Sequence, residues 1–118
     1  MNIEELIINN LLSQEEYTRK VLPFIKPEYF TVKAYSILFE LTSTYVDRYN
    51  TLPTVEVLSI ELENREDLNE QFYKDSRTAI QNVSDETSEL QWILDSTEKW
   101  CQERAIYLAL MECIQIAD

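Results

Sequence analysis

Apolar residues recur three or four positions apart along most of the chain, which is the spacing of one face of an α-helix. The pattern predicts five short amphipathic helices in the first part of the sequence. The first begins at Ile3 and the second follows Ser13. The other three are expected over residues 32–49, 55–64 and 68–83.

Residues that commonly cap helices stand at three of the predicted helix starts. Asn2 precedes the first helix, with Glu5 at its third position. Residues 13–16 have the pattern of a capping box for the second helix, and Thr54 can cap the fourth. The second helix should stop near Leu22, because the residue before Pro23 is disfavoured in the α conformation.

Several apolar residues are expected to face a common core. In the loop over residues 23–30 these are Phe24, Ile25, Tyr29 and Phe30. In the later helices they are Tyr35, Leu38, Phe39, Tyr45, Val46, Tyr49, Val57, Leu58, Leu62, Phe72, Ala79, Ile80 and Val83. Opposite charges four residues apart, Glu16 with Lys20 and Glu70 with Lys74, should pair on the outer faces.

The last predicted helix begins near Glu89 and meets no helix-breaking residue before Asp118. Its apolar stripe has spacings of three and four, and Ile93, Trp100, Tyr107 and Ile114 repeat every seven residues, as in a seam between packed helices. Thirty helical residues span about 45 Å, whereas a compact domain of this size has a radius of gyration of only about 13 Å. The helix is therefore expected to project beyond the five short helices.

The second half of this helix, residues 105–117, is apolar at eleven of its thirteen positions and on every side. A helix that is apolar all round is normally buried all round. This half should therefore pack against a following helix, another chain, or both. The alternative is a central core helix wrapped by the five short ones. The predicted fold is all-α: an orthogonal bundle over residues 1–88, then a long helix over 89–118 whose second half is an interaction arm.

Particular side chains of the last helix are candidates for distinct roles. We expect Trp100, on the apolar stripe, to belong to the core, and Arg104 to pair with a carboxylate. Trp92 lies off the stripe and is equally compatible with packing and with a contact surface. The residues expected to form an oligomer or partner interface are Tyr107, Leu108, Leu110, Met111, Ile114 and Trp92.

Composition narrows the function. The chain has no Gly, which favours helices over hairpins and excludes the glycine-rich loops that hold phosphates. The net charge of −12 argues against direct DNA binding, which is driven largely by cations. No signal peptide and no apolar run long enough to span a membrane is evident. Cys101 and Cys113 would lie about 18 Å apart on one helix and could not form a disulfide, which favours a reducing cytoplasm.

Residues for catalysis or for cofactor and metal binding are not evident. His is absent, which removes the usual general base near neutral pH and the commonest zinc ligand. Asp85, Thr87 and Glu89 match the start of a calcium loop, but Leu90 and Ser96 stand where that loop needs Gly and Glu. We therefore expect neither an active site nor a cofactor in this chain.

The segment over residues 92–105, with its Glu98-Lys99-Trp100 step and its Arg104-Ala105 pair, resembles the end of the N-terminal domain of DnaB-type replicative helicases. The segments over residues 27–30, 49–54 and 58–64 are similar as well, so the resemblance covers nearly the whole chain in order. It is closest to the branch found in T-even-like phages. Bacterial members often carry a His in the third helix, and this chain has none.

The resemblance implies a function that the residues alone do not give. In this family the N-terminal domains form a collar on the hexamer, often as a trimer of dimers, dock primase and influence the helicase loader. The last helix continues into a helical hairpin that pairs with a neighbouring subunit. A RecA-like motor that uses ATP and Mg²⁺ holds the DNA and is not contained in these 118 residues.

Two other functions were weighed. A free-standing acidic phage protein that inhibits a host enzyme by mimicking DNA would need its carboxylates in two rows, whereas here they are spread evenly among Lys residues. An enzyme that relies on carboxylate chemistry is less favoured. In the leading interpretation the domain acts in the cytoplasm of an infected bacterium.

Overall fold

A computed structural model describes the backbone of residues 2–117 and the side chains of residues 2–115, and it confirms the all-α prediction. The elements are, in order, α1 (Ile3–Ser13), α2 (Glu15–Val21), a 3₁₀ turn η1 (Pro27–Tyr29), α3 (Lys33–Tyr49), α4 (Val55–Glu63), α5 (Glu70–Gln81) and α6 (Leu90–Ala117). No strand occurs among the described residues.

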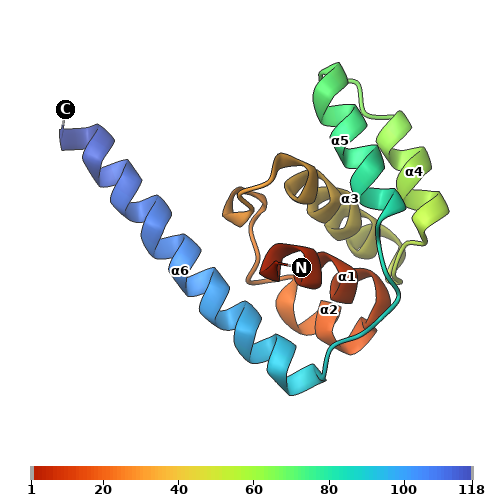
Figure 1. The fold of residues 1–118 in the computed structure, drawn as a ribbon, viewed down its shortest axis with the longest axis horizontal. Helices are drawn as coiled ribbons and strands as arrows, with labels where there is room; N and C mark the ends of the chain where they lie inside the picture. Colours follow the sequence, from red (N-terminus) through yellow and green to blue (C-terminus); the bar gives the residue numbers. More distant parts are fainter. Residues whose placement is uncertain (1, 118) are drawn as a thin grey trace.

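Helix α3 lies at the centre of the body formed by the first five helices and η1 (Figure 1). It packs against α1 and η1 on one side and against α4 and α5 on the other. Helix α6 contacts α1, α2 and η1. It runs beside the body only near its beginning and middle. Its far end extends away from the other helices, as the length argument predicted.

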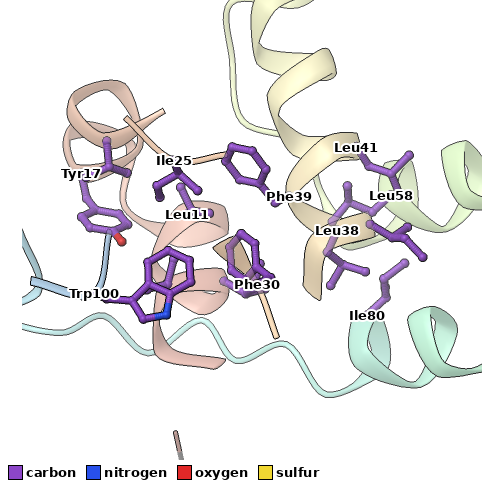
Figure 2. Close-up of a cluster of buried hydrophobic side chains, with 14 of the residues drawn as sticks. Leu11, Tyr17, Ile25, Phe30, Leu38, Phe39, Leu41, Leu58, Ile80 and Trp100 are labelled. Atoms are coloured by element: carbon purple, nitrogen blue, oxygen red, sulfur yellow. The ribbon is translucent and has the colours of Figure 1, made fainter. Parts of the chain in front are cut away.

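The core runs continuously from α2 to α5 (Figure 2). At one end Tyr17, Ile25 and Trp100 surround α1, and at the other Leu58 and Ile80 pack against α3. Each buried side chain of Leu or Ile size stabilises the fold by about 1.5–3 kcal/mol relative to its exposed state. Burial of Trp100 confirms its predicted place in the core.

Helix caps confirm several of the predicted boundaries. The side chain of Asn2 accepts a hydrogen bond from the backbone N–H of Glu5 at 2.9 Å, and that of Thr54 accepts one from Val57 at 3.2 Å. Helix α3 ends at Tyr49 and is capped by Asn50, which adopts a left-handed conformation with φ of 56°. Asn tolerates this conformation better than most residues, so it takes the place that Gly holds in other helix ends.

The segment between α5 and α6 is held against α1 by two buried Asn side chains. The Oδ1 atom of Asn9 accepts from the backbone N–H of Ser84 at 3.1 Å, and that of Asn10 accepts from the N–H of Ser88 at 2.9 Å. The Nδ2 group of Asn10 also donates to the carbonyl of Leu6 at 2.8 Å. These bonds satisfy backbone groups of an irregular segment and so fix the point at which α6 begins.

Three local predictions were wrong. Residues 13–16 do not form a capping box, because Ser13 is the last residue of α1 and its hydroxyl bonds to the carbonyl of Asn9, while α2 begins after Gln14 without a side-chain cap. Helix α5 is shorter than predicted at both ends, since its cap is Asn69. Phe24 does not fold into the core and is 70% exposed.

Most of the apolar residues of α3, α4 and α5 that were predicted to face the core are buried or partly buried, and Leu38, Leu58 and Ile80 are fully enclosed. Tyr49 and Phe72 are exposed instead. Both predicted outer ion pairs are present, with nitrogen–oxygen distances of 3.4 Å for Lys20 and Glu16 and 3.0 Å for Lys74 and Glu70. None of the helices over residues 2–117 has the length and apolarity to cross a membrane.

Candidate protein interface

The first half of α6 is firmly attached to the body. Its stripe of Ile93, Thr97 and Trp100 is buried. Trp100 packs edge-on against Tyr29, with ring centroids 6.1 Å apart, and against Phe30 at 4.9 Å. Such aromatic pairs add about 0.5–1.5 kcal/mol beyond the area that they bury. This half of the helix is therefore an integral part of the domain.

A buried hydrogen bond joins α6 to α2. The hydroxyls of Tyr17 and Thr97 lie 2.7 Å apart, and both side chains are fully enclosed. Burial raises the pKa of Tyr17, because the charged phenolate would lose its hydration in this position. The phenol therefore stays neutral and available for the hydrogen bond with Thr97.

The predicted start of α6 near Glu89 is confirmed in detail. The carboxylate of Glu89 accepts hydrogen bonds from the backbone N–H groups of Gln91 at 3.1 Å and Trp92 at 2.7 Å. These are donors that the first turn of a helix leaves without an intrahelical partner, and a negative charge there also favours the helix dipole. Glu89 thus fixes the first turn of the helix and leaves the ring of Trp92 half exposed.

Arg104 marks the point at which the body ends. Its Nε atom donates to the backbone carbonyl of Tyr29 at 2.5 Å, and its guanidinium lies over the ring of Tyr107, 4.9 Å from the centroid. The prediction of a carboxylate partner was wrong: none of the ion pairs among the described side chains includes Arg104. The carbonyl of η1 takes that role because η1 is the last part of the body that α6 passes.

Beyond Arg104 the helix carries large apolar side chains that the domain leaves largely exposed. Ile106 is 62% exposed, Leu110 58%, Ile114 57%, Tyr107 50% and Met111 39%, while Leu108 is partly covered. We call residues 105–115 the arm. The alternative of a central helix wrapped by the others is excluded, since a wrapped helix would not leave these side chains in solvent.

Contiguous exposed apolar side chains of this kind are typical of surfaces that bind another protein or another copy of the chain. The chemistry of this surface is simple: aliphatic and aromatic side chains with Glu112 as the sole acidic residue of the arm. The predicted interface residues Tyr107, Leu108, Leu110, Met111 and Ile114 lie together on this arm. Trp92 lies apart from them, near the beginning of the same helix.

Sequence reasoning missed a groove between α2, the following loop and α6. It has a volume of about 590 Å³, and its walls include Val21, Phe24, Tyr29, Leu94 and Cys101. Burial raises the pKa of Cys101 to about 11, so this thiol stays protonated near neutral pH. The sequence feature that could have indicated this groove is Phe24, an aromatic residue in the loop between Pro23 and Pro27.

No cluster of three or more Cys, Asp or Glu suited to a metal ion occurs among the described residues. Cys101 and Cys113 are both free, as their predicted separation requires. The arm and the exposed side of α6 are therefore the strongest candidates for a functional surface.

Fold and surface together define a class: a small all-α domain with a buried first half of its last helix and an uncovered apolar second half. No protein-family model matches the chain. It is, however, 30% identical over 112 residues to a DnaB-like replicative helicase of Enterobacteria phage T4. The match covers 95% of this chain and 23% of that protein, which is consistent with an N-terminal domain. The predicted relationship to DnaB-type helicases of T-even-like phages is thereby confirmed.

Proposed function

We propose that the chain is the N-terminal collar domain of a phage replicative helicase, which organises the hexamer and docks primase and the helicase loader. The observation that carries this proposal is the uncovered apolar arm beyond Arg104 in a relative of a replicative helicase. In this proposal the arm packs against other subunits. ATP, Mg²⁺ and DNA are bound by a motor domain elsewhere in the full-length protein.

The energetics of the arm support an assembly role. Five large apolar side chains are each about 40% or more exposed, and covering the exposed part of one of them is worth roughly half of the 1.5–3 kcal/mol that full burial of such a side chain contributes. Part of this gain offsets the loss of translational and rotational freedom on association. The net charge of −12 opposes non-specific association of the domain, so association depends on a partner surface that fits the arm.

The charge of the domain supports the part of this proposal that assigns DNA binding to the motor domain. An excess of twelve negative charges repels the phosphate backbone of DNA. In this proposal the collar does not bind DNA, and the motor domain does. The similarity to a helicase gives the alternative of a free-standing DNA mimic no support.

The test replaces Met111 with Asp, which puts a charge into the middle of the arm. We expect sedimentation equilibrium to show self-association of the 118-residue chain, and Met111→Asp to weaken it at least roughly tenfold, since each tenfold corresponds to about 1.4 kcal/mol. The control is Gln102→Asp, which adds the same charge to an exposed polar position of α6. Equal masses for Met111→Asp and the unaltered chain at every concentration would contradict the proposal.

A further inference from the structure

The groove between α2, the loop that follows it and α6 is long. Helix α2 contacts α6, and the groove follows the first half of α6 on that side. Helix α6 lines it from Gln91 to Ala105, through positions three or four residues apart that include Leu94, Glu98 and Cys101. At 1.5 Å per residue this stretch of helix is about 21 Å long.

The groove is narrow for its length. A volume of about 590 Å³ over about 21 Å corresponds to a mean cross-section of roughly 30 Å². An α-helix with its side chains is about 10–12 Å across, which corresponds to a cross-section of roughly 80–110 Å². The groove is therefore too narrow for a whole helix, but it can receive the side chains of a helix that lies along it. Amphipathic helices bind such grooves through apolar residues three, four and seven positions apart.

An exposed aromatic ring borders the groove on the side opposite α6. Phe24 is 70% exposed, although its backbone N–H donates to the carbonyl of Val21 at 2.9 Å. The N–H of Ile25 donates to the same carbonyl at 3.2 Å, and the ring of Pro23 fixes the backbone dihedral φ just before Phe24. One exposed apolar side chain is ordinary by itself. This one, however, lines a groove that Val21 and Leu94 also line, so it is held in place to contact an apolar side chain of a partner.

The α6 side of the groove is acidic. Asp95 and Glu98 both line it and are exposed, and neither forms an ion pair among the described side chains. Gln91 donates to the carboxylate of Asp95 at 2.8 Å, which leaves its charge uncompensated. Lys20 on the opposite side is already paired with Glu16 at 3.4 Å. In a chain of net charge −12 these two carboxylates favour a cationic partner.

The same charges argue against a second copy of this chain in the groove. The arm of another copy is apolar enough to enter it, but residues 105–115 contain no Lys or Arg and do contain Glu112. The arm would therefore leave Asp95 and Glu98 without opposite charges and would add a further carboxylate. The groove fits a different protein, which supplies Lys or Arg next to its apolar residues.

We infer that the groove docks a cationic amphipathic helix of a partner protein, with apolar side chains against Phe24 and Leu94 and with Lys or Arg against Asp95 and Glu98. This site rests on the docking part of the proposed function, to which it gives a surface and a partner chemistry. It does not depend on self-association, because the groove lies beside the body and reaches the arm only at Ala105.

Selection from a display library of peptides on the 118-residue chain supplies a probe. Peptides of about fifteen residues suffice, since as helices they are about 22 Å long. We expect the enriched peptides to be cationic and to repeat large apolar residues at spacings of three and four. Fluorescence anisotropy of one labelled synthetic peptide from this set then gives its dissociation constant. Enrichment of neutral or acidic peptides, or of none, would contradict the docking site.

Substitutions on both sides of the groove test where the peptide binds. Asp95→Lys combined with Glu98→Lys turns two attractions into repulsions and should raise the dissociation constant about tenfold at low salt, and less at high salt. Phe24→Ser removes an apolar contact and should also raise it about tenfold. All three side chains are exposed, so the circular dichroism spectra of the variants should match that of the unaltered chain.

Matched controls carry the same changes away from the groove. Asp85→Lys combined with Glu86→Lys alters the net charge equally in the exposed segment before α6. Ile60→Ser removes an exposed apolar side chain from α4, which is not part of the groove. Each control should leave the dissociation constant within about twofold of its original value, a difference of only about 0.4 kcal/mol. A loss of binding in the controls equal to that in the groove variants would mean that the peptide responds to net charge and apolarity alone, and would overturn the site.

Two native thiols report where the peptide lies without any substitution. Cys101 lines the groove, whereas Cys113 is exposed on the arm. Because burial raises the pKa of the Cys101 thiol, its alkylation by iodoacetamide is compared with and without saturating peptide. The peptide should slow alkylation of Cys101 several-fold and leave that of Cys113 unchanged. Protection of Cys113 alone would place the peptide on the arm and overturn the docking site.

The docking site and the proposed self-association can fail separately. If Met111→Asp abolishes peptide binding while the groove variants retain it, the groove is not the docking site, and self-association through the arm is untouched. If the unaltered chain is monomeric at every concentration but binds the peptide through Phe24 and Asp95, the assembly role fails and the docking site stands.

Discussion

Removal of the Trp100 side chain should weaken the attachment of α6 more than any change on the exposed side of the helix. Trp100 is only 6% exposed and packs against the rings of both Tyr29 and Phe30. Trp→Ala changes in protein cores cost about 3–5 kcal/mol, from lost transfer energy and the cavity that remains. A domain of 118 residues has a total stability of about 6–18 kcal/mol. Trp100→Ala should therefore remain folded at 25 °C with a large part of its stability lost.

The assay is urea unfolding followed by circular dichroism at a concentration low enough to keep the chain monomeric. With an m-value of about 1–3 kcal/mol per molar urea, a loss of 3–5 kcal/mol should lower the midpoint by roughly 1–5 M. Trp92→Ala is the matched control, because Trp92 lies on the same helix but is half exposed. Its free energy of unfolding should stay within about 0.5 kcal/mol of the unaltered chain.

Comparison of Trp100→Ala with Trp92→Ala can refute the view that Trp100 attaches α6 to the body. If Trp100→Ala unfolds at the same urea concentration as Trp92→Ala, the aromatic cluster does not hold α6 to the body. Trp100→Phe gives a further check, since it keeps a ring against Phe30 and should lose less stability than Trp100→Ala.

Three other changes have definite expected results. Tyr17→Phe leaves the buried hydroxyl of Thr97 without its partner and should lower the free energy of unfolding by about 1–3 kcal/mol, whereas adding Thr97→Val should recover part of that loss in the same urea assay. Ser76→Ala should raise thermal stability by a few degrees, because the buried hydroxyl of Ser76 has no hydrogen-bond partner among the described residues. Hydrogen bonds from Arg65 lower the pKa of Asp67 from its ordinary 3.8 to about 2, so an NMR titration should find this carboxyl still charged at pH 3. The folded pKa is depressed, so any stabilisation from this pair is present above pH 4 and is lost as the pH falls toward 2; a midpoint for Asp67 near 3.8 would contradict the pairing.

The sequence predicted the helices well where local chemistry decides their ends. Asn2 and Thr54 cap helices because a side-chain oxygen and the N–H three residues later are always within reach of each other. The prediction failed where one residue could belong to the end of one helix or to the beginning of the next. Ser13 could begin one helix or end another, and its hydroxyl bonds to the carbonyl of Asn9, four residues back, within α1.

Burial in loops could not be predicted from residue type alone. Phe24 and Ile25 are adjacent and both apolar, yet Phe24 is exposed and Ile25 is buried. Adjacent side chains point in different directions, and which of them reaches the core depends on the path of the backbone between Pro23 and Pro27. The partner of Arg104 was missed for a related reason, since a backbone carbonyl leaves no mark in the sequence.

The point at which α6 leaves the body was predicted from the all-round apolar composition of residues 105–117, although the heptad spacing alone does not mark it. The heptad positions Ile93, Trp100 and Tyr107 look equivalent, yet the first two are buried and Tyr107 is half exposed. Nothing in the spacing changes at Arg104, because the arm continues the same periodicity toward a different partner. What changes is the opposite face: before Arg104 it is polar, and beyond Arg104 it is apolar as well.

Substitutions in the two halves of α6 should therefore be detected by different measurements. A substitution on the buried stripe before Arg104 changes the free energy of unfolding of one chain, which does not depend on concentration. A substitution on the arm leaves that free energy almost unchanged, because the side chain is exposed in the single domain, and alters association, which does depend on concentration. Trp100→Ala and Met111→Asp lie eleven residues apart on one helix. If each variant changed both quantities to the same extent, the helix would not be divided at Arg104, and the argument from exposure to assembly would fail.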